Sequence, residues 1–202
     1  MNEKYWDSIY RRKSETEMSW YQEVPMKSLE LISELKLDLR DSIIDIGGGD
    51  SRLVDHLLSS GFRNISVLDI STESLDRTKI RLGENSKFIK FIASDITKFN
   101  PLEKYKLWHD RATFHFLRDA DEVSKYLEIA NRAISKGGFL IVSTFSKTGP
   151  EKCSGLPISK YSEIDLKLLF EKYFTNIRCF EDTHKTPTGS EQNFVYCGFK
   201  KR

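Results

Sequence analysis

From residue 42 onward, short runs rich in β-branched and aromatic residues alternate with amphipathic stretches. The short runs predict strands over 42–46, 65–69, 88–93, 106–110 and 139–144. Apolar residues at helical spacing predict a helix over 53–58, ended by Gly61, and a longer helix over 123–134. Alternation of this kind predicts a mostly parallel sheet with helices on both faces.

The two ends of the chain depart from this alternation. Near the carboxyl end, two strand-like runs, 176–181 and 193–200, are joined by a polar turn and predict an antiparallel hairpin. At the amino end, residues 1–39 predict two helical pieces that divide near Pro25. We therefore expect one domain over 1–202, with a helical cover over 1–40 and an α/β core over 41–202.

Composition narrows the possible partners and the expected location. Lys and Arg number 32 against 30 Asp and Glu, a formal net charge of +2, which disfavours capture of nucleic acid or of an anionic membrane by bulk charge. No run approaches the ~20 apolar residues of a membrane span, and the first residues show no signal core. We expect a cytoplasmic protein; the oligomeric state is not predicted.

The three cysteines, Cys153, Cys179 and Cys197, are too scattered for a disulfide framework or a zinc site. We predict no metal centre and reduced thiols. Cys179 and Cys197 could face each other on neighbouring strands, but two buried free thiols are the favoured interpretation.

A glycine run follows the first predicted strand, over 45–51. A dinucleotide-binding turn with glycines at Gly47 and Gly49 requires a third glycine at position 52, where the chain has Arg52. A nicotinamide-dependent oxidoreductase is therefore disfavoured, although it stays an alternative.

Acidic residues mark the ends of the first three predicted strands: Asp45, Asp69 and Asp95. Ligands bind at this edge of a parallel sheet. S-adenosylmethionine fits such an edge without a pyrophosphate site, and its sulfonium favours nearby acids. We expect Asp45 near the glycine turn, Asp69 on the ribose hydroxyls and Asp95 on the adenine amino group.

These features together resemble the class I S-adenosylmethionine-dependent methyltransferases over residues 42–145. The family motif D/E-x-G-x-G-x-G is matched by Asp45, Gly47 and Gly49, while Ser51 stands at the last glycine. The resemblance implies a Rossmann-like seven-stranded sheet, mostly parallel with an antiparallel last strand. It also implies S-adenosyl-L-methionine as cofactor, with contacts from the residues around the strand ends: Gly47, Gly49, Asp69, Ile70, Asp95, Ile96, Asp110 and Arg111.

A narrower resemblance lies at the amino terminus. Trp6, Asp7 and Tyr10, followed by Trp20 and Tyr21, are similar to the W-D-x-x-Y and W-Y pattern of the elongation factor 1A and citrate synthase lysine methyltransferases. This implies that Trp6, Tyr10, Trp20 and Tyr21 enclose the cofactor; plain packing of the first helix is the alternative. The stretch 110–115 matches that group's D-K-G-T-x-D only in part, which leaves the acceptor open.

Asp110 and His115 are the candidates for a catalytic role. Asp110 is expected to contact the methionine amino group or the acceptor, with helix capping as the alternative. His115 is a weak candidate for a general base, because a packed core histidine is equally consistent with its apolar neighbours. The turn-rich loop over 147–157 is expected to act as a specificity loop, in which Cys153 either contacts substrate or is an inert thiol.

The sequence therefore predicts a methyltransferase whose acceptor stays open, with a protein lysine and a small molecule as the candidates. A non-catalytic cofactor-binding or interaction module with the same fold is the main alternative.

Overall fold

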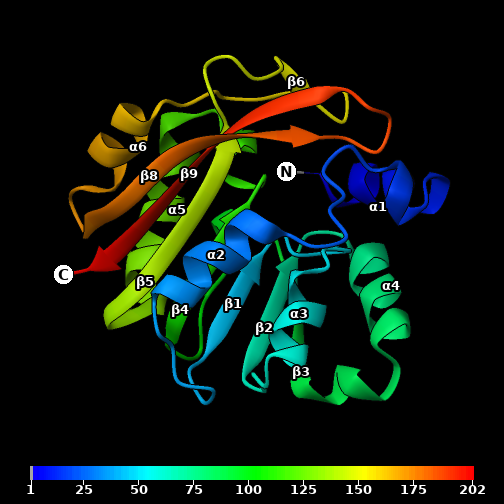
Figure 1. Ribbon diagram of the computed structural model, residues 1–202, viewed down its shortest axis with the longest axis horizontal. Coiled ribbons are helices and arrows are strands. Elements are labelled where there is room, and N and C mark those ends of the chain that lie inside the picture. Colours follow the sequence, from blue (N-terminus) through cyan, green and yellow to red (C-terminus); the bar gives the residue numbers. More distant parts are fainter. Residues whose placement is uncertain (1) are drawn as a thin grey trace.

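The computed structural model describes residues 2–202; Met1, part of the predicted amino-terminal cover, lies outside them. A seven-stranded sheet forms the centre, in the order β3-β2-β1-β4-β5-β9-β8 (Figure 1). Its strands have the following bounds: β1 Ile43–Ile46, β2 Ile65–Asp69, β3 Ile89–Ala93, β4 Tyr105–Arg111, β5 Ile134–Phe145, β8 Phe174–Lys185 and β9 Glu191–Lys201.

The pairing of these strands confirms the predicted sheet. Strands β1 to β5 pair in parallel, and β9 lies antiparallel between β5 and β8. The predicted carboxyl-terminal hairpin is therefore the β8–β9 pair, and the last strand of the chain is the antiparallel one.

Six α-helices connect or cover these strands in the described part of the chain: α1 Glu3–Arg12, α2 Met26–Glu34, α3 Leu53–Ser59, α4 Thr72–Leu82, α5 Ala120–Ala133 and α6 Glu163–Phe170. Short 3₁₀ helices occur at η1 Glu15–Glu17, η2 Gly83–Phe88, η3 Ile96–Lys98 and η4 Phe114–Phe116. A small separate hairpin pairs β6, Lys152–Cys153, with β7, Leu156–Pro157.

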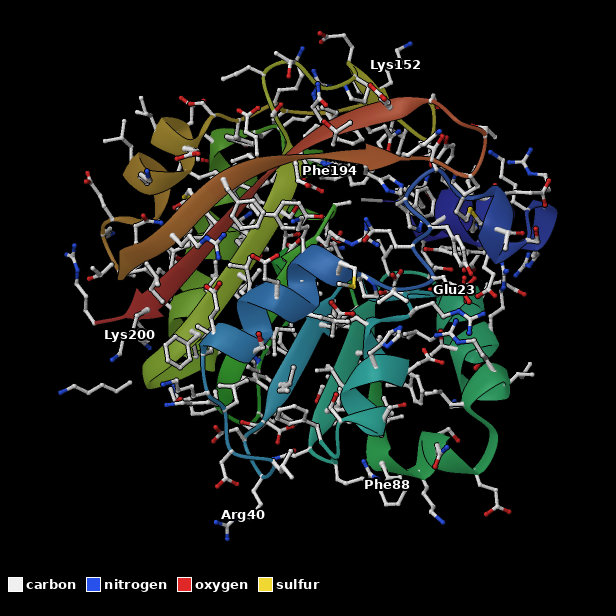
Figure 2. All side chains as sticks on the ribbon, in the orientation of Figure 1. Glu23, Arg40, Phe88, Lys152, Phe194 and Lys200 are labelled. Carbon is white, nitrogen blue, oxygen red and sulfur yellow. A yellow bond between two sulfur atoms is a disulfide. The ribbon has the colours of Figure 1, made fainter. Side chains whose placement is uncertain are left out.

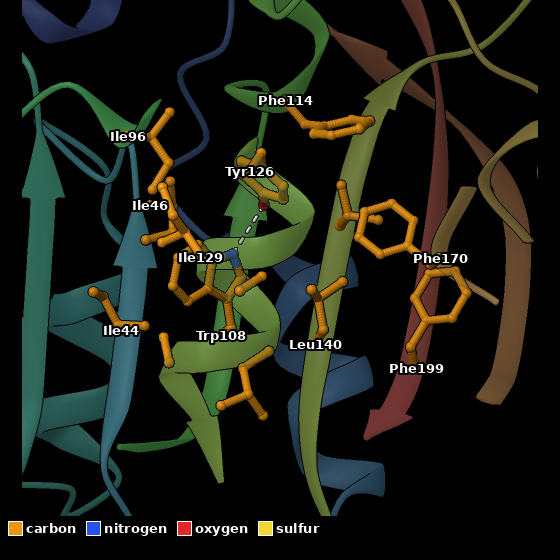
Figure 3. Close-up of a cluster of buried hydrophobic side chains, with 14 of the residues drawn as sticks. Ile44, Ile46, Ile96, Trp108, Phe114, Tyr126, Ile129, Leu140, Phe170 and Phe199 are labelled. Carbon is orange, nitrogen blue, oxygen red and sulfur yellow. Dashed lines mark hydrogen bonds between the residues drawn. The ribbon is translucent and has the colours of Figure 1, made fainter. Parts of the chain in front are cut away.

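Two apolar layers pack on the two faces of the sheet. In Figure 1, α2 and α3 lie in front of the sheet and α5 behind it. Because side chains alternate along a strand, Ile43 packs in the layer of α2 and α3, whereas Ile44 packs in the layer of α5 and α6. In the second layer, the Trp108 indole donates to the Tyr126 hydroxyl at 2.9 Å, as Figure 3 shows. Charged side chains such as Arg40 and Lys200 extend outward from the molecule in Figure 2.

The sequence prediction missed α4, α6 and the β6–β7 hairpin. The start of α6 carries a recognisable signal, because Ser162 and Asp165 form a reciprocal capping box at its first turn. The hairpin is too short to show a strand period, so only the turn residues of the loop over 147–157 indicated it.

The prediction of free thiols at Cys179 and Cys197 was wrong. These residues are directly opposite in the β8–β9 register and form a disulfide, with their Cα atoms 4.2 Å apart. Cys153 is free and buried. Within residues 2–202, none of the helices is long and apolar enough to cross a membrane.

Candidate functional site

A cleft of about 560 Å³ opens at the carboxyl ends of the parallel strands. Figure 1 shows α1 on this side of the sheet, where the arrowheads of β1 and β2 point. The lining of the cleft comes from α1, from the ends of β2, β3 and β4, and from the β6–β7 hairpin: Trp6, Tyr10, Trp20, Gly47, Leu68, Asp69, Ile70, Ser94, Ile96, Arg111, Ala112, Thr113, Phe116 and Cys153.

The glycine turn after β1 forms the floor beside Asp69. Gly47 has a φ of +62°, and a side chain there would overlap the Thr113 hydroxyl. A Cβ at Gly49 would lie 2.6 Å from Asp69 Oδ2. The glycines at these two positions therefore let the backbone pass close to β4 on one side and to the Asp69 carboxylate on the other.

Asp69 ends β2 and lies in the cleft wall with only 6% of its surface exposed. Its Oδ1 accepts a hydrogen bond from the Ser71 backbone N–H at 2.8 Å. Burial raises the pKa of Asp69 to about 7, against the opposing effect of this hydrogen bond. A ligand that donates hydroxyl hydrogen bonds to this carboxylate would favour its ionised form.

The aromatic cover is held in place by polar contacts between α1 and α4. Ser71 Oγ donates to Asp7 Oδ1 at 2.6 Å, and Arg77 Nη1 donates to the Tyr10 carbonyl at 2.9 Å. Trp6 and Tyr10, on the same helix, are buried and line the cleft. Asp7 of the W-D-x-x-Y pattern is therefore an anchor for the two aromatic residues.

The two residues of the second aromatic pair, Trp20 and Tyr21, differ in whether they line the main cleft. Trp20 lines the main cleft and packs edge-to-face with Trp6, with ring centroids 6.1 Å apart. Tyr21 instead lines a smaller neighbouring cavity with Arg52. Of the two predicted residues, the structure thus places Trp20 on the main cleft and Tyr21 beside it.

Asp45 lies beneath the glycine turn, within a chain of buried polar groups. Its Oδ1 is 2.7 Å from His109 Nδ1, and His109 Nε2 is 2.8 Å from Ser28 Oγ. These three side chains connect β1, β4 and α2. Asp45 borders a small cavity beside Gly47 instead of the main cleft.

The end of β3 contributes an apolar and a polar contact surface. Ser94 and Ile96 line the main cleft, whereas Asp95 borders an adjoining open cavity. Asp95 Oδ1 accepts from the Thr97 backbone N–H at 2.9 Å and so caps the 3₁₀ helix η3.

Asp110 faces the apolar layer of α5 and does not line the cleft. Its Oδ1 accepts from the Thr113 and Phe114 backbone N–H groups at 3.0 and 3.2 Å, and its Oδ2 accepts from the Tyr126 hydroxyl at 2.7 Å. The carboxylate is fully buried, and burial raises its pKa to about 6. Asp110 therefore has the geometry of a capping residue, which was the alternative to contact with the methionine amino group or the acceptor.

His115 lies in the interior, where its ring stacks on Phe145 with centroids 4.8 Å apart. Burial lowers the pKa of His115 to about 3, so the imidazole is neutral at physiological pH. It lies outside the cleft lining. His115 therefore has the geometry of a packed core histidine, which was the alternative to a general base.

The β4 end instead brings the neighbouring Arg111 to the cleft. Arg111 Nη2 donates to the Trp20 carbonyl at 3.0 Å. Thr113 and Phe116, which the sequence analysis did not single out, complete this wall. The sequence gives little indication of their role, because packing explains a threonine and a phenylalanine in a turn after a strand as readily as ligand binding does.

The 147–157 loop closes the cleft from above. Cys153 of β6 lines the cleft, and the Tyr5 hydroxyl of α1 donates to the Ser154 carbonyl. Burial raises the pKa of Cys153 to about 12, so its thiol stays protonated.

A family described as a methyltransferase domain matches residues 37–182 of this chain. The chain belongs to this family. The match includes the glycine turn, the β2 end and the β4 end, and excludes the aromatic α1.

Curated relatives of this methyltransferase domain include enzymes of two acceptor classes. The chain is 28% identical over 133 residues to malonyl-acyl-carrier-protein O-methyltransferase 2 of Ilyobacter polytropus, with 63% of this chain and 50% of that protein covered. It is 26% identical over 162 residues to EEF1A lysine methyltransferase 2 of Danio rerio, covering 72% and 69%. The chain thus spans half the length of the first relative.

Solved structures confirm the Rossmann-like fold. The N-methyltransferase NodS of Bradyrhizobium japonicum, in complex with S-adenosyl-L-homocysteine, superimposes with a TM-score of 0.72 at 15% identity, covering 96% of this chain and 97% of that chain.

Proposed function

We propose that this protein is an S-adenosyl-L-methionine-dependent methyltransferase. The observation that carries the proposal is the buried Asp69 carboxylate, which faces a cleft between the glycine turn and an aromatic cover. A carboxylate in this position suits two vicinal ribose hydroxyls, and the aromatic faces of Trp6 and Tyr10 suit a sulfonium. The membership of the family and the acceptor classes of the relatives support the same proposal.

The remaining cofactor contacts follow from the lining of the cleft. Ile70, Ser94 and Ile96 supply the apolar edge and small polar group for adenine, with Asp95 beside them at the adjoining opening. Gly47 leaves room for the methionine end. Arg52, which would disturb a dinucleotide turn, is outside the cleft lining and pairs with Glu15.

The cofactor, when bound, supplies an electrophilic methyl group that needs no metal-bound or covalent enzyme intermediate. The chain's contribution is to position the reactants and to exclude water. The α1 cover and the 147–157 loop enclose the cleft for this purpose, and their contact between Tyr5 and Ser154 holds them together. We also propose that 1–202 acts as one domain; the cytoplasmic location stays a prediction.

Calorimetric titration with S-adenosylhomocysteine tests the cofactor site. Wild-type protein should bind, and Asp69→Ala should weaken binding roughly 100-fold or more, because hydrogen bonds to a charged group contribute about 1.5–3 kcal/mol each. Asp76→Ala is the matched control, since Asp76 is an exposed acid on α4. Wild-type protein that does not bind S-adenosylhomocysteine would contradict the proposal.

Transfer of radiolabelled methyl groups into a lysate, separated into protein, nucleic-acid and small-molecule fractions, tests the activity itself. Label should enter the protein or the small-molecule fraction. Cofactor binding without any transfer would instead favour the non-catalytic module.

A further inference from the structure

The two flanks of the cleft carry opposite charges. Asp69 lies on the β2 flank and Arg111 on the β4 flank. Arg111 Nη2 is bonded to the Trp20 carbonyl, but its Nη1 is buried and finds no hydrogen-bond acceptor among residues 2–202. A buried guanidinium N–H without an acceptor is costly. A ligand that brings an anionic oxygen or sulfur to this nitrogen would remove that cost.

The surroundings of Arg111 leave its charge unopposed. Trp20, Phe116 and Cys153 line the same cleft as Arg111. Across the described part of the chain, no carboxylate lies within ion-pair distance of the Arg111 guanidinium. This flank therefore favours an anion with a flat apolar body, and it disfavours an ammonium group.

The cleft also lacks a group that would take a proton from an acceptor. Its titratable lining residues in the described chain are Tyr10, Asp69, Arg111 and Cys153. Burial raises the pKa of Tyr10 well above its ordinary value and that of Cys153 to about 12, so both stay protonated near neutral pH. In the proposed function Asp69 holds the ribose. An acceptor that arrives already deprotonated needs none of these groups as a base.

We propose that the methyl acceptor is a small, flat organic anion whose nucleophilic atom is a deprotonated oxygen or sulfur, held by Arg111 beside Trp20 and Phe116. The inference rests on the proposed function. The acceptor atom supplies the electron pair for the new bond to the methyl carbon, the carbon–sulfur bond of the cofactor breaks with its pair on sulfur, and no proton moves. A sulfonium and an anion become two neutral groups at the reacting atoms.

A pair of probes of similar shape and different charge tests this proposal by binding alone. The probes are 2,4-dinitrophenolate, an anion at pH 7.5, and neutral 2,4-dinitroaniline, each titrated into protein saturated with S-adenosylhomocysteine. Wild-type protein should bind the phenolate at least about tenfold more tightly, because a hydrogen bond to a charged group contributes about 1.5–3 kcal/mol. Equal affinity for the two probes would overturn the proposal, and this comparison needs no variant.

Two variants of Arg111 and one control variant, Arg118→Gln, assign the preference to Arg111. Arg111→Gln should remove it, Arg111→Lys should retain most of it because the charge remains, and Arg118→Gln, an exposed arginine in the same connection to α5, should leave it unchanged. Arg111→Gln should weaken binding of S-adenosylhomocysteine clearly less than it weakens binding of the phenolate, for which a loss of about tenfold is expected.

The outcomes separate this inference from the proposed function. Wild-type protein that does not bind S-adenosylhomocysteine would contradict the proposed function. Binding of S-adenosylhomocysteine that Arg111→Gln weakens as much as binding of the phenolate would assign Arg111 to the cofactor and overturn the inference alone. Faster methyl transfer to a short peptide with one lysine than to phenolate or thiolate acceptors would also overturn it.

Discussion

The ends of β2 and β4 look alike in the sequence and differ in the structure. Each of the two predicted strands, 65–69 and 106–110, ends in an acid, Asp69 or Asp110, and burial raises the pKa of both. Ile46 of β1 pairs with Leu68 on one side and with Asp110 on the other, so Asp110 is level with Leu68, and Arg111 is level with Asp69. Successive residues of a strand face opposite sides. Because Asp110 is offset by one residue from Asp69, β2 contributes an acid to the cleft and β4 contributes an arginine.

This difference separates a ligand-facing carboxylate from a structural one. Asp69 borders the cleft, where it accepts from the Ser71 backbone N–H, whereas Asp110 accepts three hydrogen bonds in the interior. The first carboxylate can therefore meet a ligand in the cleft, and the second holds the turn after β4. An acid at a strand end thus indicates a binding role only when the strand's register turns it toward the cleft.

Substitutions of Asp69 and Asp110 should change the free energy of unfolding in opposite directions, and this is the largest expected difference between the two strand ends. Asp110→Ala leaves the Tyr126 hydroxyl and two backbone N–H groups without their acceptor, and should lower the free energy of unfolding by about 3–5 kcal/mol. Asp69→Asn should instead raise it by about 0.5–2 kcal/mol at pH 8, because it removes a buried charge. Urea denaturation of both variants measures these changes.

The sign of the Asp69 effect follows from its titration. Its pKa is raised from 3.8 to about 7 on folding, so the native state binds more protons than the unfolded state between these values. Stability from this group is therefore present at low pH and is lost as pH rises through about 7. Equal destabilisation by Asp69→Asn and Asp110→Ala would show that the two carboxylates have the same role.

His115 offers a second contrast, between a core histidine and a catalytic base. Its pKa falls on folding from 6.5 to about 3, so the unfolded state binds the proton first and stability is lost as pH falls below 6.5. The free energy of unfolding of His115→Phe, measured relative to wild type, should therefore rise by about 2 kcal/mol when the pH is lowered from 7.5 to 5. The rise is about 1.36 kcal/mol for each pH unit below 6.5. Urea denaturation at the two pH values measures this gain. An unchanged difference between wild type and variant would mean that the imidazole reaches solvent.

The affinity for S-adenosylhomocysteine should depend on the protonation of Asp69. Ribose hydroxyls donate to the ionised carboxylate, so with a pKa of about 7 the affinity should be about tenfold lower at pH 6 than at pH 8. Calorimetry at both pH values measures the ratio. Asp69→Asn serves as the control, since its residual binding should lack this dependence; the same dependence in the variant would assign the titration to another group.

The smallest expected effect concerns the backbone of the β4 end. Ala112 has a φ of +70°, in the left-handed region that favours glycine, and lines the cleft. Ala112→Gly should raise the free energy of unfolding by up to about 1 kcal/mol, because the strain relieved slightly exceeds the added chain entropy. Thermal denaturation measures the change. A clear loss of stability would show that the Ala112 methyl group contributes packing that outweighs the strain.

Much of the fold and the β2 side of the site were predictable from the sequence. Period-two and helical spacing gave the strands and the sheet class, and Gly47, Gly49 and Asp69 have spacings that few other architectures require. Their chemistry is local: a turn that needs glycine directly after a strand, and an acid directly after the next strand. These features do not depend on how distant segments pack.

The β4 side was less predictable because it depends on register between strands. Whether Asp110 or Arg111 faces the cleft is set by the pairing of Ile46 with Asp110, which no local pattern shows. The disulfide between Cys179 and Cys197 likewise depends on a hairpin register over 18 residues. Thr113 and Phe116 reach the cleft from the connection after β4, whose path is fixed by tertiary contacts.

A crystal structure of the protein with S-adenosylhomocysteine tests the assignment of Asp69 most directly. We expect both ribose hydroxyls within hydrogen-bond distance of the Asp69 carboxylate, adenine beside Ile96, and Asp110 still bonded to Tyr126. Adenosine bound away from Asp69, or a ligand contact made by the Asp110 carboxylate, would contradict the division of roles between the β2 and β4 ends.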